Sequence, residues 1–383
     1  MAKNDAPGRQ IRYSQSMIAL RPHPRILVLA LRRLGDVLLT TPLIRSLKHA
    51  FPEAAIDALV FAGTEGILTG NPDLSRTIAL PVRASAGEGL ALAGSLWRRY
   101  DLAISTQSGD RPIFLAWVAG RISAGPVAGT SAASWLKRFA LTHPAAPEDE
   151  QHRIEEILSI GTALGVAPLR EVVCPAGAVR TELMPRGDYA VIHAGPMFRY
   201  KQWTQSGWRE LAAALRARGL SVVATGGPSA EDRRYLDTIW DGADVRRLDG
   251  VLTWAELAAL IRAARLYAGP DTSVTHLAAA TGVPTIAVYG PTDPRRWGPW
   301  PAGGLSTAWA AAGTIQSRGN VWLVQNPLPC MPCQNEGCER RLDSHSQCLD
   351  ELPVEQVLVA ADRALQHAAA LDRAPAMPQR GAL

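Results

Sequence analysis

Short apolar runs alternate along the chain with longer stretches in which apolar residues recur every three or four positions. In the first part, the strand-like runs are residues 25–31, 56–61, 77–80 and 102–105. The stretches with helical spacing are residues 37–50, 88–99, 112–119 and 150–164. Apolar strands without polar alternation belong in sheets that are covered on both faces, and their alternation with helices indicates parallel pairing. The pattern therefore predicts an α/β protein with a doubly wound parallel sheet.

The same pattern starts again after a looser, proline-containing stretch near residue 180. The second part has predicted strands at residues 189–193 and 220–225 and predicted helices at 207–218, 229–240, 253–264 and 353–370. The helix at 253 opens with a capping box, Thr253-Trp-Ala-Glu256. A chain of 383 residues is also long enough for two cores. We therefore predict two Rossmann-like domains facing a cleft, residues 25–180 and 181–370.

The most informative stretch is LYAGPDTSVTHLAAATGVPTIAVYGP, which begins at residue 266. Two strand-like runs enclose a short helical run, at residues 266–268, 285–289 and 274–281 respectively. Gly269-Pro270 is predicted to end the first strand, and Asp271, Thr272 and Ser273 can cap the helix. Ligands of parallel sheets bind at the carboxyl ends of strands, and a helix N-terminus there favours an anion. One hypothesis is the diphosphate of a nucleotide sugar; the alternative is an ordinary capped helix.

The charge, the motifs and the length of the apolar runs limit the classes of ligand and protein to be considered. The formal net charge is +5 and the pI is about 9.1, which suits an anionic ligand or membrane surface but is too diffuse for nucleic acid. Neither a G-x-G-x-x-G nor a Walker A lysine motif is present, which argues against dinucleotide oxidoreductases and P-loop NTPases. There is no apolar run of about 18 residues and no signal segment, so we predict a cytoplasmic protein. Residues 1–24 and 371–383 are predicted to be a disordered leader and tail.

A glycine and an acidic residue stand between the first predicted strand and the first predicted helix, in Arg33-Leu34-Gly35-Asp36. Gly35 permits a tight turn, and the helix dipole favours an ionised Asp36. A carboxylate in the cleft could accept a proton from a sugar hydroxyl as a general base. The alternative is that Asp36 only caps the helix.

Two loops of the second domain carry further candidates. After the strand at 189–193 comes HAGPMFRYKQW, in which Arg199 and Lys201 could neutralise a leaving diphosphate. The alternative there is a solvated basic loop. After the strand at 220–225 comes Gly226-Gly227, with Glu231 early on the next helix, where a ribose or base could be hydrogen-bonded.

Four of the five cysteines lie close together, at Cys330, Cys333, Cys338 and Cys348. Four thiolates can close a tetrahedral Zn or Fe site, which would be structural because no open position is left for a substrate. The spacing is not that of a standard zinc finger, so reduced and packed thiols are the alternative. Disulfides are the least favoured outcome in the cytosol.

In their order along the chain, these motifs resemble glycosyltransferase family 9, the ADP-heptose:lipopolysaccharide heptosyltransferases. The similar stretches are RLGDVLLTTPLIRSLKHAFP, HAGPMFRYKQW and GPDTSVTHLAAATGVPTIAVYGPTDPRRWGP, and the similarity runs from about residue 25 to about residue 357. The resemblance implies a GT-B fold and an inverting, metal-independent transfer from ADP-L-glycero-D-manno-heptose. It also implies a lipopolysaccharide inner-core acceptor, met at the cytoplasmic face of the inner membrane.

The resemblance assigns roles to individual residues. Asp36 would be the general base, Lys201 would stabilise the diphosphate, and Asp271 would contact the donor sugar. The residues assigned to donor binding as a whole are Gly195, Arg199, Glu231, Asp271, Thr272, Ser273 and His276. The first domain would then bind the acceptor and the second the nucleotide sugar.

Two positions depart from the family pattern. Ser273 stands where glycine is usual, so its side chain narrows the approach to the phosphate, and Met197 stands where a small or hydroxyl residue is common. Two alternative functions therefore stay open. One is a heptosyltransferase of the same fold that modifies protein side chains, and the other is a catalytically silent nucleotide- or carbohydrate-binding module.

Overall fold

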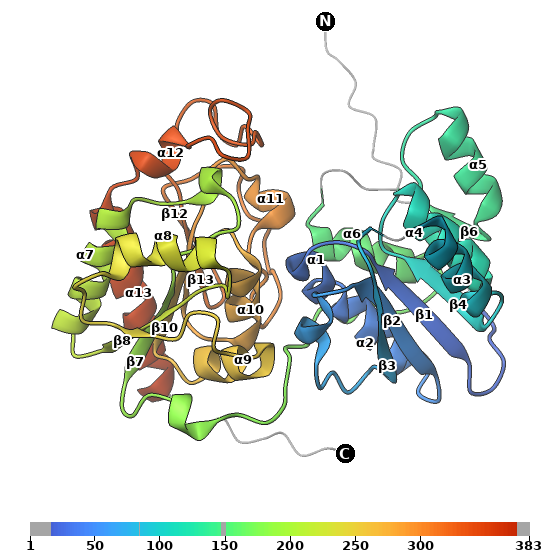
Figure 1. Ribbon diagram of the computed structural model, residues 1–383, viewed down its shortest axis with the longest axis horizontal. Coiled ribbons are helices and arrows are strands. Elements are labelled where there is room, and N and C mark those ends of the chain that lie inside the picture. Colours follow the sequence, from blue (N-terminus) through green and yellow to red (C-terminus); the bar gives the residue numbers. More distant parts are fainter. Residues whose placement is uncertain (1–16, 84, 147–150, 374–383) are drawn as a thin grey trace, which may run out of the picture.

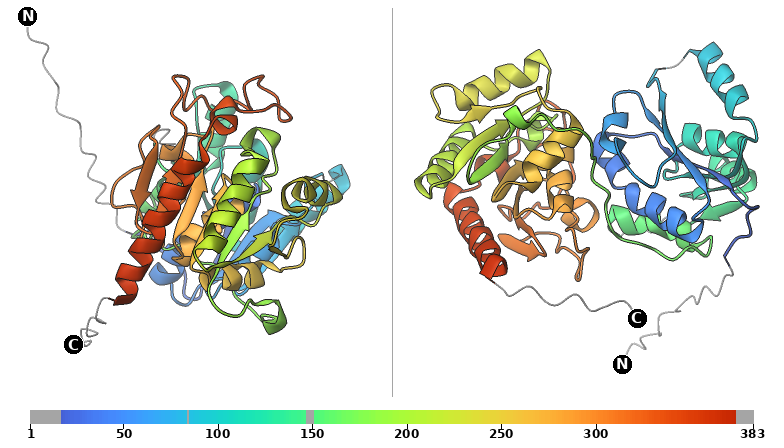
Figure 2. Two further views of the ribbon diagram at one scale, coloured as in Figure 1. Left: turned by 90° about the vertical axis from the view of Figure 1, so that its left-hand side faces the viewer. Right: turned by 90° about the horizontal axis from the view of Figure 1, so that it is seen from below.

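The computed structural model describes residues 17–83, 85–146 and 151–373, which form two α/β lobes side by side (Figure 1). The view from below also shows the lobes as separate bodies, each with helices around a central sheet (right-hand view of Figure 2). Within the described residues, no helix is both long and apolar enough to cross a membrane.

The sheet of the first lobe has parallel strands in the order β3-β2-β1-β4-β5-β6. Its strands are β1 (Arg25–Ala30), β2 (Ala55–Phe61), β3 (Arg76–Leu80), β4 (Tyr100–Ser105), β5 (Gly120–Pro126) and β6 (His143–Ala145). Its helices are α1 (Leu34–Leu38), α2 (Thr41–Ala50), η1 (Glu65–Leu68), α3 (Ala86–Leu96), α4 (Asp110–Ala119), α5 (Ala132–Ala140) and α6 (Arg153–Thr162). The strand order reverses between β1 and β4, so the loops that follow these two strands border the ligand crevice of a doubly wound sheet.

The sheet of the second lobe has the order β12-β13-β11-β10-β7-β8-β9, parallel except between β12 and β13. Its strands are β7 (Tyr189–His193), β8 (Ser221–Thr225), β9 (Arg246–Arg247), β10 (Leu266–Pro270), β11 (Thr285–Val288), β12 (Ile315–Arg318) and β13 (Val321–Val324). Its helices are η2 (Thr181–Leu183), η3 (Arg199–Lys201), α7 (Gln205–Ala217), α8 (Ala230–Trp240), α9 (Trp254–Arg262), α10 (Ser273–Thr281), α11 (Pro294–Trp297), α12 (Gln347–Asp350) and α13 (Val354–Arg373). Here the strand order reverses between β7 and β10.

Apolar side chains cover both faces of the first sheet and also pack between the two lobes. Alternate residues of β1 enter different cores: Ile26 and Val28 face one side, and Leu27 and Leu29 face the other. The first of these cores continues into the second lobe, because α1 packs against α10. The lobes are therefore joined by buried side chains as well as by the connecting chain.

The prediction of two facing Rossmann-like folds is confirmed, and two details are wrong. The helix predicted at 37–50 is two helices, because Pro42 has no N–H for the Leu38 carbonyl; the Thr41 hydroxyl donates to that carbonyl instead (2.8 Å). Strand β10 does not end before Gly269 but continues through Pro270, which pairs with Val288 of β11. Pro270 is tolerated there because it is the last residue of the strand.

Some expectations fall at the edges of the described chain. Of the predicted leader, residues 1–16 lie outside the described residues, whereas Ile18 packs on the core and Arg21 pairs with Asp101 at 2.8 Å. Residue 150, where a helix was predicted to start, and residues 374–383 also lie outside. Helix α6 begins at Arg153, and α13 continues to Arg373.

Candidate active site

Asp36 lies in the loop-to-helix turn after β1, at the reversal point of the first sheet. The N-cap of α1 is Arg33, and Asp36 is in the first helical turn. Asp36 therefore does not cap the helix, and its carboxylate is available for other contacts. The favourable position of an acidic group near a helix N-terminus agrees with the sequence prediction.

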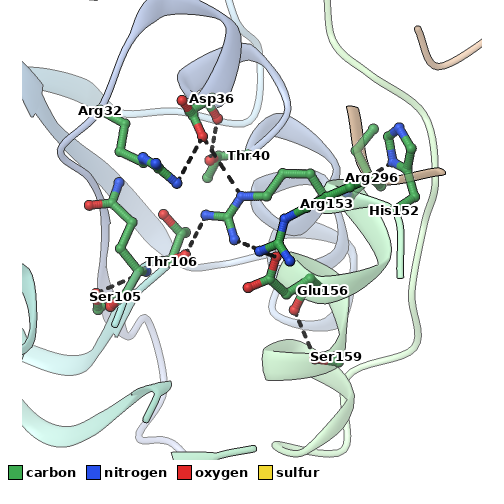
Figure 3. A network of polar contacts seen from close by, with 12 residues as sticks. Arg32, Asp36, Thr40, Ser105, Thr106, His152, Arg153, Glu156, Ser159 and Arg296 are labelled. Carbon is green, nitrogen blue, oxygen red and sulfur yellow. Dashed lines mark hydrogen bonds and ion pairs between the residues drawn. The ribbon is translucent and has the colours of Figure 1, made fainter. Parts of the chain in front are cut away.

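Two arginines flank the Asp36 carboxylate (Figure 3). Arg32 Nη1 lies 3.5 Å and Arg153 Nε 3.8 Å from Asp36 Oδ1. Arg153 is almost completely buried and is held by the Thr106 carbonyl (2.6 Å) and by Glu156 (2.8 Å). Burial raises the pKa of Asp36 above its ordinary value, although Arg32 and Arg153 oppose that shift. The carboxyl thus has the environment of a base that is more basic than a solvated aspartate.

Among the described residues, two atoms of this cluster around Asp36 have no hydrogen-bond partner. In the portion of the chain that the structure describes, Asp36 Oδ1 and Arg153 Nε are buried without a hydrogen bond. Their separation of 3.8 Å is too long for one between them. Unsatisfied buried polar atoms are costly, so a pair of them beside a reversal point indicates a place where a substrate hydroxyl can complete the network.

Helix α10 begins at the position where the sequence predicts an anion-binding site. Thr272 is its N-cap and accepts a hydrogen bond from the Thr275 N–H (3.4 Å). The first N–H groups of a helix, here those of Ser273 and Val274, have no partner within the helix. They point out of the carboxyl edge of the second sheet, beside Asp271 at the end of β10.

Lys201 and Asp271 form an ion pair across the reversal point of the second sheet. Lys201 Nζ lies 2.5 Å from Asp271 Oδ2, and the Thr292 hydroxyl donates to the same oxygen at 2.6 Å. Burial alone would raise the pKa of Asp271, but Lys201 and Thr292 outweigh it and hold the pKa below its ordinary value. Burial also lowers the pKa of the neighbouring His276 to about 4, so that its imidazole is neutral at pH 7.

The two lobes bring these groups together. A Cβ built on Gly35 would lie 3.7 Å from the side chain of His276 and from Ser273 Cα. The guanidinium of Arg33 lies 4.6 Å from the ring centre of Phe198, in the loop that leads to Lys201. Asp36, the next residue after Gly35, thus borders the N-terminus of α10, and the loop that carries Asp36 also meets the loop that carries Lys201.

Further polar contacts cross between the lobes at the start of α6. His152 Nε2 bonds the Gly298 carbonyl at 2.8 Å, and Arg296 Nη2 lies 3.0 Å from Glu156. A carbonyl can only accept, so Nε2 of His152 carries the proton and Nδ1 accepts from the Ile154 N–H (3.2 Å). Burial lowers the pKa of His152 to about 4, in agreement with this neutral form. Glu156 thereby connects Arg153, beside Asp36, with the second lobe.

Three other residues predicted to bind the sugar donor lie outside the hydrogen-bonded group around Asp271. Arg199 is exposed and lines a hollow with Gln202, Tyr235 and His345 on the second lobe. Glu231 is exposed in the first turn of α8, where its neighbour Asp232 and not Glu231 completes the capping box. Gly195 follows β7 and faces Leu236 of α8 at ordinary contact distance. Within the described chain, no hydrogen bond or ion pair joins any of these three residues to Asp271.

The four late cysteines are near one another but differ in environment. Cys348 is buried and Cys330 and Cys338 are exposed, and all are free thiols. Burial raises the pKa of Cys348 to about 12, with further contributions from the three other thiols. Among the described residues, no group of three or more His, Cys, Asp or Glu side chains has an arrangement that could hold a metal ion. The side chains as placed therefore do not form a finished ligand set.

Two doubly wound lobes whose reversal points meet in this way have the GT-B architecture. Residues 90–304 match the family described as Glycosyltransferase family 9 (heptosyltransferase). Similar proteins include a lipopolysaccharide heptosyltransferase 3 of Escherichia coli, 34% identical over 286 residues (70% of this chain, 83% of the relative). A second, from E. coli K12, is 30% identical over 354 residues (86% and 95%).

Solved structures agree on the fold. The E. coli heptosyltransferase WaaC, determined with ADP, superposes with a TM-score of 0.68 at 22% identity and covers 89% of this chain and 99% of its own. Its complex with ADP-2-deoxy-2-fluoro heptose gives a TM-score of 0.66 at 21% identity, with 88% and 99% covered. On these matches, the chain belongs to glycosyltransferase family 9, the heptosyltransferases.

Proposed function

We propose that this protein transfers a heptose from ADP-L-glycero-D-manno-heptose to a lipopolysaccharide inner-core acceptor, with inversion and with Asp36 as the general base. The acceptor class is supported by the relatives named lipopolysaccharide heptosyltransferase 3. The donor class is supported by the fold neighbour bound to an ADP-heptose analogue. The observation that carries the proposal is the contact of Gly35, next to Asp36, with Ser273 and His276 at the start of α10.

The proposed reaction is a single displacement. The oxygen of an acceptor hydroxyl attacks the anomeric carbon of the heptose, and its proton passes to the Asp36 carboxylate. The bond from the anomeric carbon to the diphosphate breaks, and its electron pair leaves on ADP. Lys201 and the N-terminus of α10 stabilise the charge that develops on the diphosphate. Attack on the face opposite the leaving group inverts the anomeric configuration, and no metal is needed for the chemistry.

The test is transfer in vitro. Incubation with ADP-heptose and a deacylated core acceptor should release ADP and add one heptose to the acceptor, whereas ADP-glucose should serve poorly. Binding of ADP without transfer to any acceptor would favour a silent binding module. Addition of heptose to a co-expressed surface protein, detected by mass spectrometry, would favour a protein acceptor.

Arg153 should tune the general base. Replacement by methionine removes a cation that lowers the pKa of Asp36, so this pKa should rise further. Because the base acts only when ionised, the acid limb of the pH profile of kcat/KM should move to higher pH, and Arg153→Lys should leave it near the wild-type position. Arg170→Met is the matched control, since Arg170 pairs at 2.6 Å with Glu155, which lies on the same helix as Arg153. An unmoved acid limb in Arg153→Met would exclude this role.

We also propose that Cys330, Cys333, Cys338 and Cys348 hold a structural Zn or Fe ion. The closeness of the four thiols supports it, although a metal ion would have to draw them together. Protein purified without chelator should contain about one such ion per chain. A matched Cys348→Ser variant should contain less, whereas Cys174→Ser should not differ from the wild type. Elemental analysis that finds no metal in the wild type would end the proposal.

A further inference from the structure

Large apolar side chains gather on one exposed face of the first lobe. They come from the α3 region, α4 and α5, and we call them the apolar patch. Its members are Leu90, Trp97, Phe114, Trp135, Leu136 and Phe139, and each is at least half exposed. Phe139 is 81% and Leu90 73% exposed, values unusual for side chains of this size. Contiguous exposed apolar surface of this kind marks a site of interaction.

The three helices form one surface. Helix α4 packs against both α3 and α5, on the side of the first lobe that faces away from the second lobe (Figure 1). Aromatic rings are in contact along it: Trp135 stacks on Phe139 with centres 6.0 Å apart, and Phe114 lies 6.0 Å from Trp117. The patch is therefore separate from the site between the lobes and stays accessible when that site is filled.

The segment that carries the apolar patch is rich in basic residues. From residue 82 to residue 140 the chain has seven Arg and Lys residues and three Asp and Glu residues, in a protein whose formal net charge is +5. Lys137 and Arg138 lie on α5 between Trp135 and Phe139 in sequence, where Lys137 pairs with Asp110 at 2.6 Å. Most of the formal excess of positive charge thus falls in the segment that also carries these exposed apolar side chains.

We infer that the apolar patch docks on the surface of an anionic phospholipid bilayer. Tryptophan and phenylalanine enter the headgroup boundary of a bilayer, and adjacent Lys and Arg attract anionic lipids. A second copy of this chain is a less suitable occupant, because two equally basic surfaces repel one another. The inference rests on the proposed function in one respect only: a lipid-linked acceptor gives the enzyme a reason to remain at a membrane.

Vesicle flotation tests the inference with the full chain. The wild type should float with phosphatidylcholine vesicles that contain phosphatidylglycerol, less with phosphatidylcholine alone, and less as salt rises. Trp135→Ser with Phe139→Ser should weaken binding by about tenfold or more, since each removes a large apolar side chain from the contact. Both side chains are exposed, so the variant should fold normally. The matched control is Leu342→Ser with Val359→Ser, which removes exposed apolar side chains outside the patch.

Activity on a deacylated, water-soluble acceptor separates this inference from the proposed function. The Trp135→Ser/Phe139→Ser variant should keep wild-type turnover on that acceptor. Absence of binding by the wild type to anionic vesicles would overturn the inference even if transfer is observed. Self-association of the wild type that disappears in the patch variant would assign the patch to a second copy instead. Vesicle binding by a chain that transfers no sugar would leave the docking inference standing and overturn only the proposed function.

Discussion

In the Asp36→Asn variant we expect sugar transfer to fall about 10²–10⁴-fold, the usual range for loss of a general base. Asparagine has nearly the same shape and can still occupy the space between Arg32 and Arg153, but it cannot accept the acceptor proton. The loss should therefore appear in kcat with little change in the affinity for ADP. Initial rates of ADP release, together with calorimetry of ADP binding, measure the two effects separately.

The same variant should be more stable than the wild type at neutral pH. The pKa of Asp36 is raised in the folded protein, so the folded state binds the proton more tightly than the unfolded state. Such a group favours folding below its unfolded pKa, near 3.9, and this contribution is lost as pH rises through the folded pKa. Asparagine removes the cost of the buried charge, so the melting temperature should rise at pH 7 and converge with that of the wild type in acid.

A second buried aspartate in the same lobe gives the control. Asp57 lies near the amino end of β2, at the opposite edge of the sheet, where it accepts from Tyr100 (2.7 Å) and pairs with Arg76 (2.9 Å). Asp57→Asn should lower stability and leave turnover per folded molecule unchanged. If Asp36→Asn behaved in the same way, with lower stability and retained turnover, Asp36 would be a structural residue and the proposed base would be lost.

Hydrophobic periodicity could predict the central part of both lobes because their strands are buried on two faces. Strand β7 has the predicted bounds, and the capping box at Thr253 is present with both of its hydrogen bonds. In the first lobe, the strands that were not predicted, β5 and β6, have weaker hydrophobic patterns. The strand β5 contains Gly120, Ser123 and Gly125, and β6 has only three residues, so neither gives a recognisable apolar run.

The network around Asp36 could not be read from local pattern. Arg153 and Arg296 lie more than one hundred residues from Asp36 in sequence. The folding of the first lobe brings Arg153 to Asp36, and the packing of the second lobe brings Arg296 to Glu156. One signal was present. Arg153 is a cation at the first position of a helix, where the dipole disfavours it, and Glu156 follows one turn later. A misplaced charge of this kind indicates a partner elsewhere in the fold.

For Gly226-Gly227, a motif that the sequence analysis linked to ribose binding has a structural explanation as well. A Cβ on Gly226 would overlap Leu236, and one on Gly227 would overlap the carboxylate of Asp232. Both glycines thus let α8 approach the end of β8 without displacing these two side chains. Their presence by itself gives no evidence for a ribose contact, and the role of Glu231 stays a prediction.

The second large effect should come from Lys201. Replacement by methionine should lower kcat by about 10²–10³-fold, because the ammonium opposes charge that grows on the diphosphate only as the bond breaks. Binding of intact ADP-heptose should weaken much less. Lys48→Met is the matched control, since Lys48 lies in the first lobe and donates to the Ala54 carbonyl (2.9 Å).

The ion pair with Asp271 allows catalysis and stability to be separated. Lys201→Met removes the cation that pairs with the buried Asp271 carboxylate and leaves it only with neutral hydrogen-bond donors such as Thr292, so the single variant should also lose stability. In Lys201→Met/Asp271→Asn the uncompensated charge is gone, and the melting temperature should recover while kcat stays low. Recovery of kcat together with stability would show that Lys201 acts only by neutralising Asp271. If kcat remains low in a stable double variant, the role of Lys201 in catalysis is to stabilise the charge on the leaving diphosphate.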